Sequence, residues 1–175
     1  MTRAALFLDR DGVVNREVGY VWQPERFEIL PQAIGMGRLA QQLGYPVVIV
    51  TNQAGVARGL YTEADVEALH TLVCAAFDDA GLPAPDIWYC PHHPDYSGRC
   101  LCRKPEGLWF ERALARGRYA PDRCWMVGDH ERDLVVPKRL GFTTVFIGES
   151  APAVADFTVP DVGAALELLR LHLAG

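Results

Sequence analysis

Five apolar runs rich in β-branched and aromatic residues recur along the 175-residue chain, and segments with helical spacing separate them. Each run has the length and composition of a buried strand. The runs cover residues 4–9, 46–52, 86–90, 124–129 and 143–148. The helical patterns cover residues 31–44, 62–80, 105–117, 130–140 and 160–174. Strands that alternate with helices predict an α/β fold with a doubly wound, Rossmann-like parallel sheet.

The length of the chain fits one domain, residues 1–175, with a single substantial core. The segments between the expected strands are too short to hold an inserted cap domain. Residues 12–30 form the one long connection without strong helical periodicity, and long loops beside a site are often functional. We therefore expect this segment to form a flap over the active site.

Composition narrows the function classes. The chain has 17 basic and 22 acidic residues, a net charge of -5, which argues against broad nucleic-acid binding. No apolar run approaches the roughly 20 residues that span a bilayer. Five cysteines, three of them in one short loop, fit a metal site better than a disulfide framework. We expect a cytoplasmic monomer that contacts neither membrane nor nucleic acid.

Acidic, basic and hydroxyl side chains stand where the expected strands end. Asp9 and Asp11 follow the first strand, Thr51 ends the second, Lys104 follows the third, and Asp129 follows the fourth. Ligands of doubly wound sheets bind at the carboxyl ends of the strands, so these side chains should share one site. Asp9 and Asp129 could hold Mg²⁺ through carboxylate oxygens, as Mg²⁺ is usually held beside phosphates.

This set of groups suits phosphoryl transfer. A carboxylate such as Asp9 can attack phosphorus if charge on the transferring group is neutralised. Mg²⁺, Thr51 and Lys104 could neutralise that charge. Asp11 is then available to protonate the leaving oxygen and later to deprotonate the attacking water. The sequence therefore predicts a phosphomonoesterase.

Four segments in order resemble the motifs of the haloacid dehalogenase (HAD) superfamily of phosphatases: FLDRDGVVN, TNQ, RKP and VGDHERD. The resemblance implies that Asp9 is the nucleophile and Asp11 the general acid and base. It also implies that Thr51 and Lys104 stabilise the phosphoryl group. Asp9, Asp129 and the backbone carbonyl of Asp11 would bind Mg²⁺. Asp133, the second acid of the fourth motif, is expected to play a supporting role.

The loop CPHHPDYSGRCLC, residues 90–102, offers a second metal site. Cys90, His92, Cys100 and Cys102 supply three thiolates and one imidazole, a full tetrahedral set for structural Zn²⁺. His93 is a rival ligand, but the C-x-H spacing favours His92. Because Cys102 adjoins Arg103, zinc would fix the direction of Arg103 and Lys104 and act as a scaffold.

Within the superfamily, GYVWQPERFEILP and TNQAGVARGLYTEADVEALH resemble the D-glycero-D-manno-heptose 1,7-bisphosphate 7-phosphatase family. The resemblance implies a small phosphorylated sugar as substrate and Arg103 as a residue that recognises it. We also expect a substrate contact from His130, which stands where that family often has lysine. The remaining residues expected to line the substrate are Glu17, Val18, Gly19, Tyr20, Asn52, Gln53 and Ala54.

Two alternatives stay open. The spacer from His92 to Cys100 is closer in length to that of histidinol-phosphate phosphatases, which would keep the mechanism and change the substrate. A zinc-ribbon-like binding module is the more distant alternative, because C-x-H and C-x-C pairs occur in such modules. The acidic pair Asp9 and Asp11 would have no purpose in that module.

Overall fold

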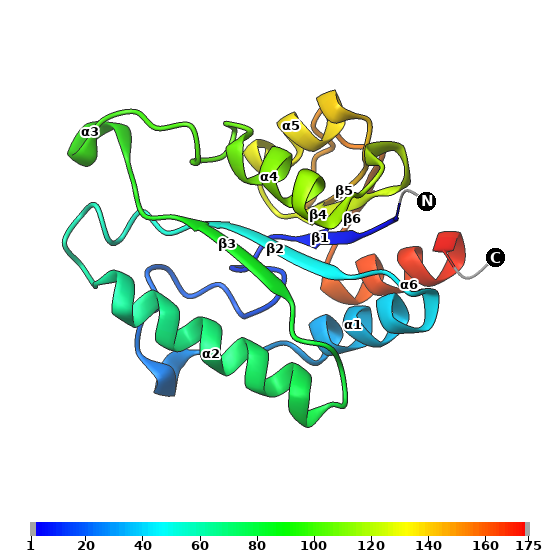
Figure 1. Ribbon diagram of the computed structural model, residues 1–175, viewed down its shortest axis with the longest axis horizontal. Helices are drawn as coiled ribbons and strands as arrows, with labels where there is room; N and C mark the ends of the chain where they lie inside the picture. Colours follow the sequence, from blue (N-terminus) through cyan, green and yellow to red (C-terminus); the bar gives the residue numbers. More distant parts are fainter. Residues whose placement is uncertain (1–2, 174–175) are drawn as a thin grey trace.

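The computed structural model describes residues 3–173, which form one parallel sheet with helices on both faces (Figure 1). The strands are β1 (Leu6–Leu8), β2 (Val47–Asn52), β3 (Asp86–Cys90), β4 (Trp125–Gly128), β5 (Thr143–Ile147) and β6 (Phe157–Val159). The α-helices are α1 (Pro31–Leu43), α2 (Glu63–Asp79), α3 (Pro94–Ser97), α4 (Leu108–Gly117), α5 (Glu131–Leu140) and α6 (Val162–Leu173). Two single 3₁₀ turns, Pro24–Arg26 and Pro121–Arg123, complete the elements.

The strand order is β3-β2-β1-β4-β5-β6, and every neighbouring pair is parallel. In β1, Leu6 lies opposite Val47 of β2 on one side and Trp125 of β4 on the other. The chain builds outward from β1 to β3, then crosses back to β4 and builds the other way. This confirms the predicted doubly wound sheet and places its switch point between β1 and β4.

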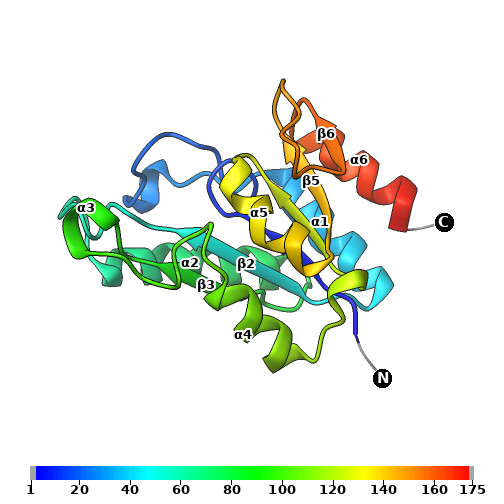
Figure 2. The ribbon, with the colours of Figure 1, turned by 90° about the horizontal axis from the view of Figure 1, so that it is seen from above.

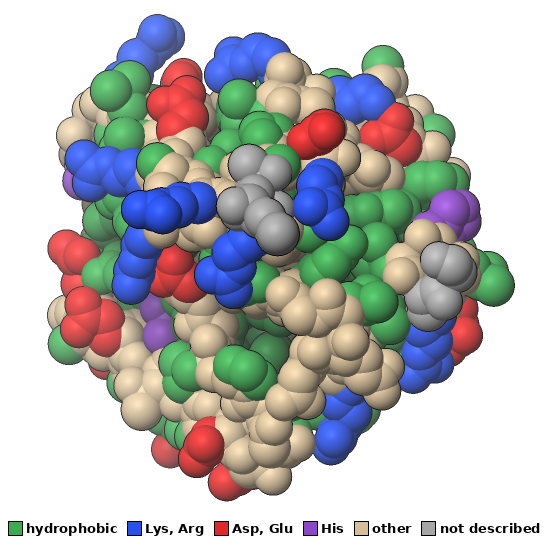
Figure 3. Space-filling model, turned by 45° about the vertical axis from the view of Figure 1, so that its right-hand side comes forward, with side chains coloured by type: hydrophobic (Ala, Val, Ile, Leu, Met, Phe, Trp, Pro, Cys, Tyr) green, Lys and Arg blue, Asp and Glu red, His purple; other side chains and the backbone are tan. Residues whose placement is uncertain are grey.

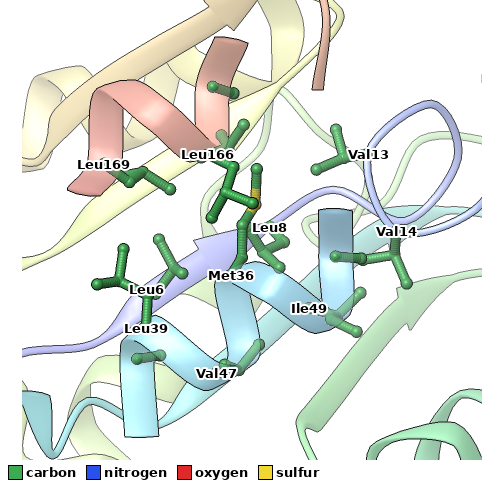
Figure 4. Packing of buried hydrophobic residues seen from close by; sticks show 14 of the residues in the cluster. Leu6, Leu8, Val13, Val14, Met36, Leu39, Val47, Ile49, Leu166 and Leu169 are labelled. Carbon is green, nitrogen blue, oxygen red and sulfur yellow. The ribbon is translucent and has the colours of Figure 1, made fainter. Parts of the chain in front are cut away.

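Successive residues of a strand point to opposite faces of the sheet, so alternate residues pack into two separate cores. Leu6 and Leu8 face the layer of α1, α2 and α6, where Met36 and Leu166 pack against them (Figure 4). Phe7 faces the opposite layer, where it packs against Phe110 of α4. Figure 1 shows the sheet between the two helix layers, and Figure 2 shows the molecule from the side of α4 and α5. Because β1 is completely buried on both faces, it reads as a continuous apolar run.

Three features differ from the sequence prediction. The strand β6 was not expected; it spans three residues and pairs with the end of β5. Helix α4 begins at Leu108 and not at residue 105, because residues 103–107 form turns. The short helix α3 lies inside the cysteine loop. Residue 174 of the expected last helix lies outside the described residues.

The loops that follow the first three strands lie at the end of the molecule opposite the two termini (Figure 1). In the same view, α3 lies at the end with these loops. On the face in Figure 3, Lys and Arg side chains lie among Asp and Glu side chains. Among the described helices, none is long and apolar enough to cross a membrane.

Candidate active site

The acids of the first and fourth motifs meet at the switch point of the sheet. Asp9 and Asp11 follow β1, and Asp129 follows the adjacent strand β4. The two segments approach so closely at Gly12 that a Cβ there would lie 2.1 Å from Asp129 Oδ2. Gly12 also has φ +83°, which side chains rarely adopt. The turn between Asp11 and Val13 therefore requires glycine.

Asp9, Lys104 and Asp133 form a buried charged group. Lys104 Nζ lies 2.7 Å from Asp9 Oδ1 and 2.8 Å from Asp133 Oδ1, and it also donates to the Val50 carbonyl at 2.6 Å. The Lys104 side chain is 1% exposed and that of Asp9 is 9% exposed. A buried ammonium group needs such partners, and here it donates hydrogen bonds to Asp9 and the Val50 carbonyl and forms an ion pair with Asp133.

Two acids against one ammonium group leave negative charge in excess. Burial and the charge of Asp133 raise the pKa of Asp9 to about 7, and Lys104 only partly opposes them. The pKa of Lys104 stays above its ordinary value because Asp133 and Asp9 outweigh the effect of its burial. A cation beside Asp9 would remove this conflict, because it would favour the ionised carboxylate.

The oxygen atoms needed for a hard cation are present. One atom from each of Asp9, Asp129, His130 and Asp133 lies within 4.8 Å of the others. Asp129 Oδ1 is 2.8 Å from His130 Nδ1, while Asp133 already pairs with Lys104. Carboxylates of Asp9 and Asp129 are the donors that Mg²⁺ prefers. The residues thus fit the magnesium site expected from the sequence.

Asn52 holds the backbone of Lys104 from β2. Its Oδ1 accepts from the Lys104 N–H at 2.9 Å, and its Nδ2 donates to the Lys104 carbonyl at 3.1 Å. Both ends of the amide are therefore used within the protein. Asn52 borders the cavity, as expected, and its side chain also fixes the position from which Lys104 reaches Asp9.

Asp11 points into a dense hydrogen-bond network. Its Oδ1 accepts from Asn15 Nδ2 at 3.0 Å, and its Oδ2 accepts from Gln53 Nε2 at 2.8 Å. The guanidinium of Arg10 contacts both oxygens, at 2.9 and 3.2 Å. Sequence analysis missed Arg10, which is 1% exposed, because an arginine between two acids resembles a solvated residue.

The cysteine loop brings four metal-binding side chains together. The Sγ atoms of Cys90, Cys100 and Cys102 lie 3.1–3.5 Å apart, and His92 Nδ1 lies 3.4 Å from Cys102 Sγ. Zn–S bonds of about 2.3 Å in a tetrahedron separate the sulfurs by about 3.8 Å, so the group has nearly the size of a zinc site. Burial raises the pKa of Cys102, so a cation is needed to hold its thiolate.

His93 lies outside this group and has another structural role. It precedes α3, and its Nδ1 accepts from the Asp95 N–H at 3.3 Å. His92 alone of the two histidines joins the cysteines. The spacing argument therefore selected the imidazole that the structure brings to the sulfurs.

A cavity of about 450 Å³ opens above these groups. Among its walls are most of the residues expected to line a substrate: Glu17, Gly19, Tyr20, Asn52, Gln53, Ala54, Arg103 and His130. Val18 is not among the lining residues and is 38% exposed. Asp9, Asp11, Thr51 and Lys104 also face the cavity. Sequence analysis missed several lining residues: Arg10, Val21, Arg58, Tyr61, His93 and Arg132.

Arg58 connects two sides of this cavity through aromatic contacts. Its guanidinium carbon lies 5.5 Å from the ring centre of Tyr20 in the flap and 5.0 Å from that of Tyr96 in α3. Such cation–π contacts are worth about 0.5–1 kcal/mol at exposed sites. We call Tyr20, Arg58 and Tyr96 the rim stack; it links the flap to the cysteine loop.

Comparison with known proteins agrees with this fold and identifies the family. A family model described as HAD-hydrolase-like matches residues 101–165. The D-glycero-beta-D-manno-heptose-1,7-bisphosphate 7-phosphatase of Haemophilus ducreyi is 36% identical over 162 residues, which cover 88% of this chain and 87% of that protein. The corresponding alpha-anomer enzyme of Photorhabdus laumondii is 38% identical over 148 residues, covering 81% and 80%.

A solved structure has a similar fold. The D,D-heptose 1,7-bisphosphate phosphatase of B. bronchiseptica, complexed with magnesium and phosphate, superposes with a TM-score of 0.82 at 30% identity, covering 95% of this chain and 98% of that one. The fold and these relatives define an HAD-like phosphatase. Within that class, the chain belongs to the D-glycero-D-manno-heptose 1,7-bisphosphate 7-phosphatase family. This membership overturns the alternative of a zinc-ribbon-like binding module.

Proposed function

We propose that the protein removes the C7 phosphate of D-glycero-D-manno-heptose 1,7-bisphosphate through a phospho-aspartate on Asp9. The observation that carries the proposal is the position of Asp9 at the cavity, beside Lys104 and the acids of the fourth motif. The names of the relatives support the sugar bisphosphate as substrate.

In the first step, a carboxylate oxygen of Asp9 attacks phosphorus and the bond from phosphorus to the C7 oxygen breaks. Asp11 gives a proton to that leaving oxygen, which becomes the sugar hydroxyl. In the second step, Asp11 takes a proton from water, and the water oxygen attacks phosphorus. The bond from phosphorus to Asp9 breaks, which releases inorganic phosphate and restores the enzyme.

The chain's own groups stabilise the transferring phosphoryl group. Thr51 Oγ1 accepts from Gln53 Nε2 at 2.9 Å, which leaves its hydroxyl hydrogen free to donate to a phosphoryl oxygen. Lys104 supplies a positive charge beside Asp9. Mg²⁺, held by Asp9, Asp129 and the Asp11 carbonyl, would neutralise further charge on the phosphate. Zn²⁺ would be structural and would take no part in the reaction; its ligands would be Cys90, His92, Cys100 and Cys102.

The rim of the cavity suits a second anionic group. Burial and the nearby charge of Arg132 lower the pKa of Arg103, and both side chains line the cavity. An anion between them would relieve this repulsion. Arg103 Nη1 donates to the His92 carbonyl at 3.3 Å, which ties its direction to the cysteine loop. We propose that the C1 phosphate of the sugar binds at Arg103.

Residues 1–175 would form one phosphatase domain. The flap, at about 12–30, and the zinc loop, at 90–102, would cover the site in place of a cap domain. His130, Glu17, Gly19 and Tyr20 would contact the sugar from the cavity wall. Val18 would act only through the backbone, since its side chain is exposed and does not border the cavity.

The test is phosphate release by the purified protein with Mg²⁺, using both anomers of the heptose bisphosphate and histidinol phosphate as separate substrates. We expect a preference for a heptose bisphosphate, with release stopping after one phosphate. A preference for histidinol phosphate would keep the mechanism and reject the substrate. No release from any monoester would reject the proposed function as a whole. Arg116→Met, an exposed change far from the cavity, is the control variant.

A further inference from the structure

Arg10 and Gln53 connect Asp11 to His70 and Tyr61. Arg10 donates to Asp11 through Nε at 3.3 Å and through Nη2 at 2.9 Å, and Nη2 also reaches Gln53 Oε1 at 3.2 Å. Both side chains are at most 2% exposed. A guanidinium that is buried this completely is unfavourable unless its donors are paired. The contacts with Asp11 and Gln53 therefore allow Arg10 to stay buried beside the site.

The far side of Arg10 is held by α2 and the flap. Its Nη1 lies 3.4 Å from His70 Nε2, and its guanidinium lies 5.4 Å from the ring centre of Phe27. Burial and the charge of Arg10 lower the pKa of His70 to about 4, so the imidazole is neutral at pH 7. Since a guanidinium only donates, His70 Nε2 accepts. His70 and Phe27 thus fix the plane of the guanidinium.

The direction of the Gln53 amide is fixed in the same way. Its Oε1 accepts from Arg10 and from the Tyr61 hydroxyl at 2.9 Å. Burial raises the pKa of Tyr61 to about 12, so the hydroxyl keeps its proton. With its oxygen held by two donors, the amide must point both Nε2 hydrogens at acceptors, namely Asp11 Oδ2 and Thr51 Oγ1.

We propose that Arg10 and Gln53, held from behind by His70 and Tyr61, are positioning residues that aim the Asp11 carboxyl group at the leaving oxygen. The inference rests on the proposed function, in which Asp11 protonates that oxygen. Arg10, Gln53 and Tyr61 border the cavity, but in this proposal they act on the leaving oxygen only through Asp11. An acid must lie within hydrogen-bond reach of the oxygen that it protonates, and small displacements lower the rate strongly.

The test uses leaving groups of different basicity. The sugar leaves as an alkoxide and needs the proton, whereas p-nitrophenolate leaves without it. We therefore expect Arg10→Met to lower kcat/KM for heptose bisphosphate by about 10–100-fold and for p-nitrophenyl phosphate by no more than about 3-fold. kcat/KM is the right quantity, because it excludes hydrolysis of the phospho-enzyme. Arg10→Lys should restore little, since an ammonium group cannot replace the planar fork.

Tyr61→Phe is the milder variant, since it removes one hydroxyl and keeps the ring. We expect a loss of about 2–10-fold for the sugar phosphate alone. Asp11→Asn gives the reference pattern, and Arg116→Met gives the unaffected one. Thermal unfolding checks that each variant is folded.

The inference would be overturned if a variant lost kcat/KM equally with both substrates. It would also be overturned if Arg10→Met or Tyr61→Phe kept the parent kcat/KM for the sugar phosphate. A crystal structure of Tyr61→Phe in which Gln53 and Asp11 keep their directions would overturn it too. If the parent enzyme released no phosphate from either compound, the proposed function itself would fail. If Asp11→Asn lost activity equally on both, the role of Asp11 as the acid would fail, while the phosphatase would stand.

Discussion

The buried acids and lysine at the strand ends are held in place differently from the cysteine loop beside them. Asp9, Lys104 and Asp133 are fixed by ion pairs within the core. In the cysteine loop, residues 94–99 are exposed and Leu101 is 69% exposed, so apolar burial fixes very little of it. Its order must come from the group of three sulfurs and one imidazole. Ion pairs within the fold stabilise the first region, and we propose that a bound metal stabilises the second.

The two regions nevertheless meet in consecutive residues. Cys102 belongs to the sulfur group, Arg103 borders the cavity, and Lys104 reaches Asp9. Changes in the core should therefore stop the reaction and leave the metal in place. Changes in the cysteine loop should release the metal and weaken the reaction. The following predictions test this contrast, beginning with the largest effect.

Asp9→Asn should lower turnover of the sugar phosphate by at least about 10³-fold, because an amide cannot attack phosphorus. Zinc content and the thermal unfolding temperature should stay near those of the parent, since Asn is the same size and the cysteine loop is untouched. Phosphate release and elemental analysis measure the two effects. Turnover within tenfold of the parent would contradict the nucleophile assignment.

Lys104→Met should lower turnover by about 10²–10³-fold. It should also lower the free energy of unfolding by about 3–5 kcal/mol, because Asp9 and Asp133 lose the cation between them. Urea unfolding measures the stability. Lys138→Met is a matched control at the other lysine of the sequence, whose ion pair with Asp156 is partly exposed and should contribute about 1 kcal/mol or less. Equal destabilisation by both changes would contradict the burial argument.

Cys102→Ser should release zinc and lower kcat/KM by about 10–100-fold, because Arg103 and Lys104 lose their anchor. Elemental analysis and steady-state kinetics check this. Cys74→Ser is the control, since Cys74 lies on α2 outside the sulfur group. Unchanged kinetics after loss of zinc would show that the core alone positions Lys104. The cysteine loop would then have no effect on the reaction.

Arg58→Gln should raise KM by about 2–5-fold with kcat unchanged, because it removes both contacts of the rim stack. Arg112→Gln removes a similar contact with Trp109, outside the cavity walls, and serves as the control. In a Cys102→Ser background the effect of Arg58→Gln should shrink, because Tyr96 belongs to the cysteine loop. If the effects of Arg58→Gln and Cys102→Ser on KM were fully additive, the rim stack would not couple the flap to the cysteine loop.

The sequence predicted the parts of the molecule that depend on local patterns. β1 and β2 are buried on both faces, so their apolar runs identified them, and the strand ends then located Asp9, Asp11 and Thr51. β6 was not predicted, because it is three residues long and depends on pairing with β5. Asp156 accepts from the Thr144 N–H at 2.9 Å and so holds that segment across twelve residues, which no local pattern reports.

The site was less predictable where side chains meet from distant segments. Arg10 is buried only because Gln53 and His70 converge on it from 43 and 60 residues away. Tyr61 gains its role from the bond to Gln53, and Gly55 leaves room for its ring, since a Cβ there would lie 2.1 Å from Tyr61 Cε1. Residues of the motifs could be found from the sequence, whereas the residues that orient them required the fold.

The close approach at Gly12 limits what mutation can change in this protein and its descendants. Because any Cβ there would meet Asp129 at 2.1 Å in a backbone conformation with φ +83°, no single substitution at that position is neutral. The exposed side chains of Val18 and Tyr20, a few residues further along, meet no such barrier. Substitutions can therefore accumulate in the flap, while the turn at Gly12 from which it starts stays fixed.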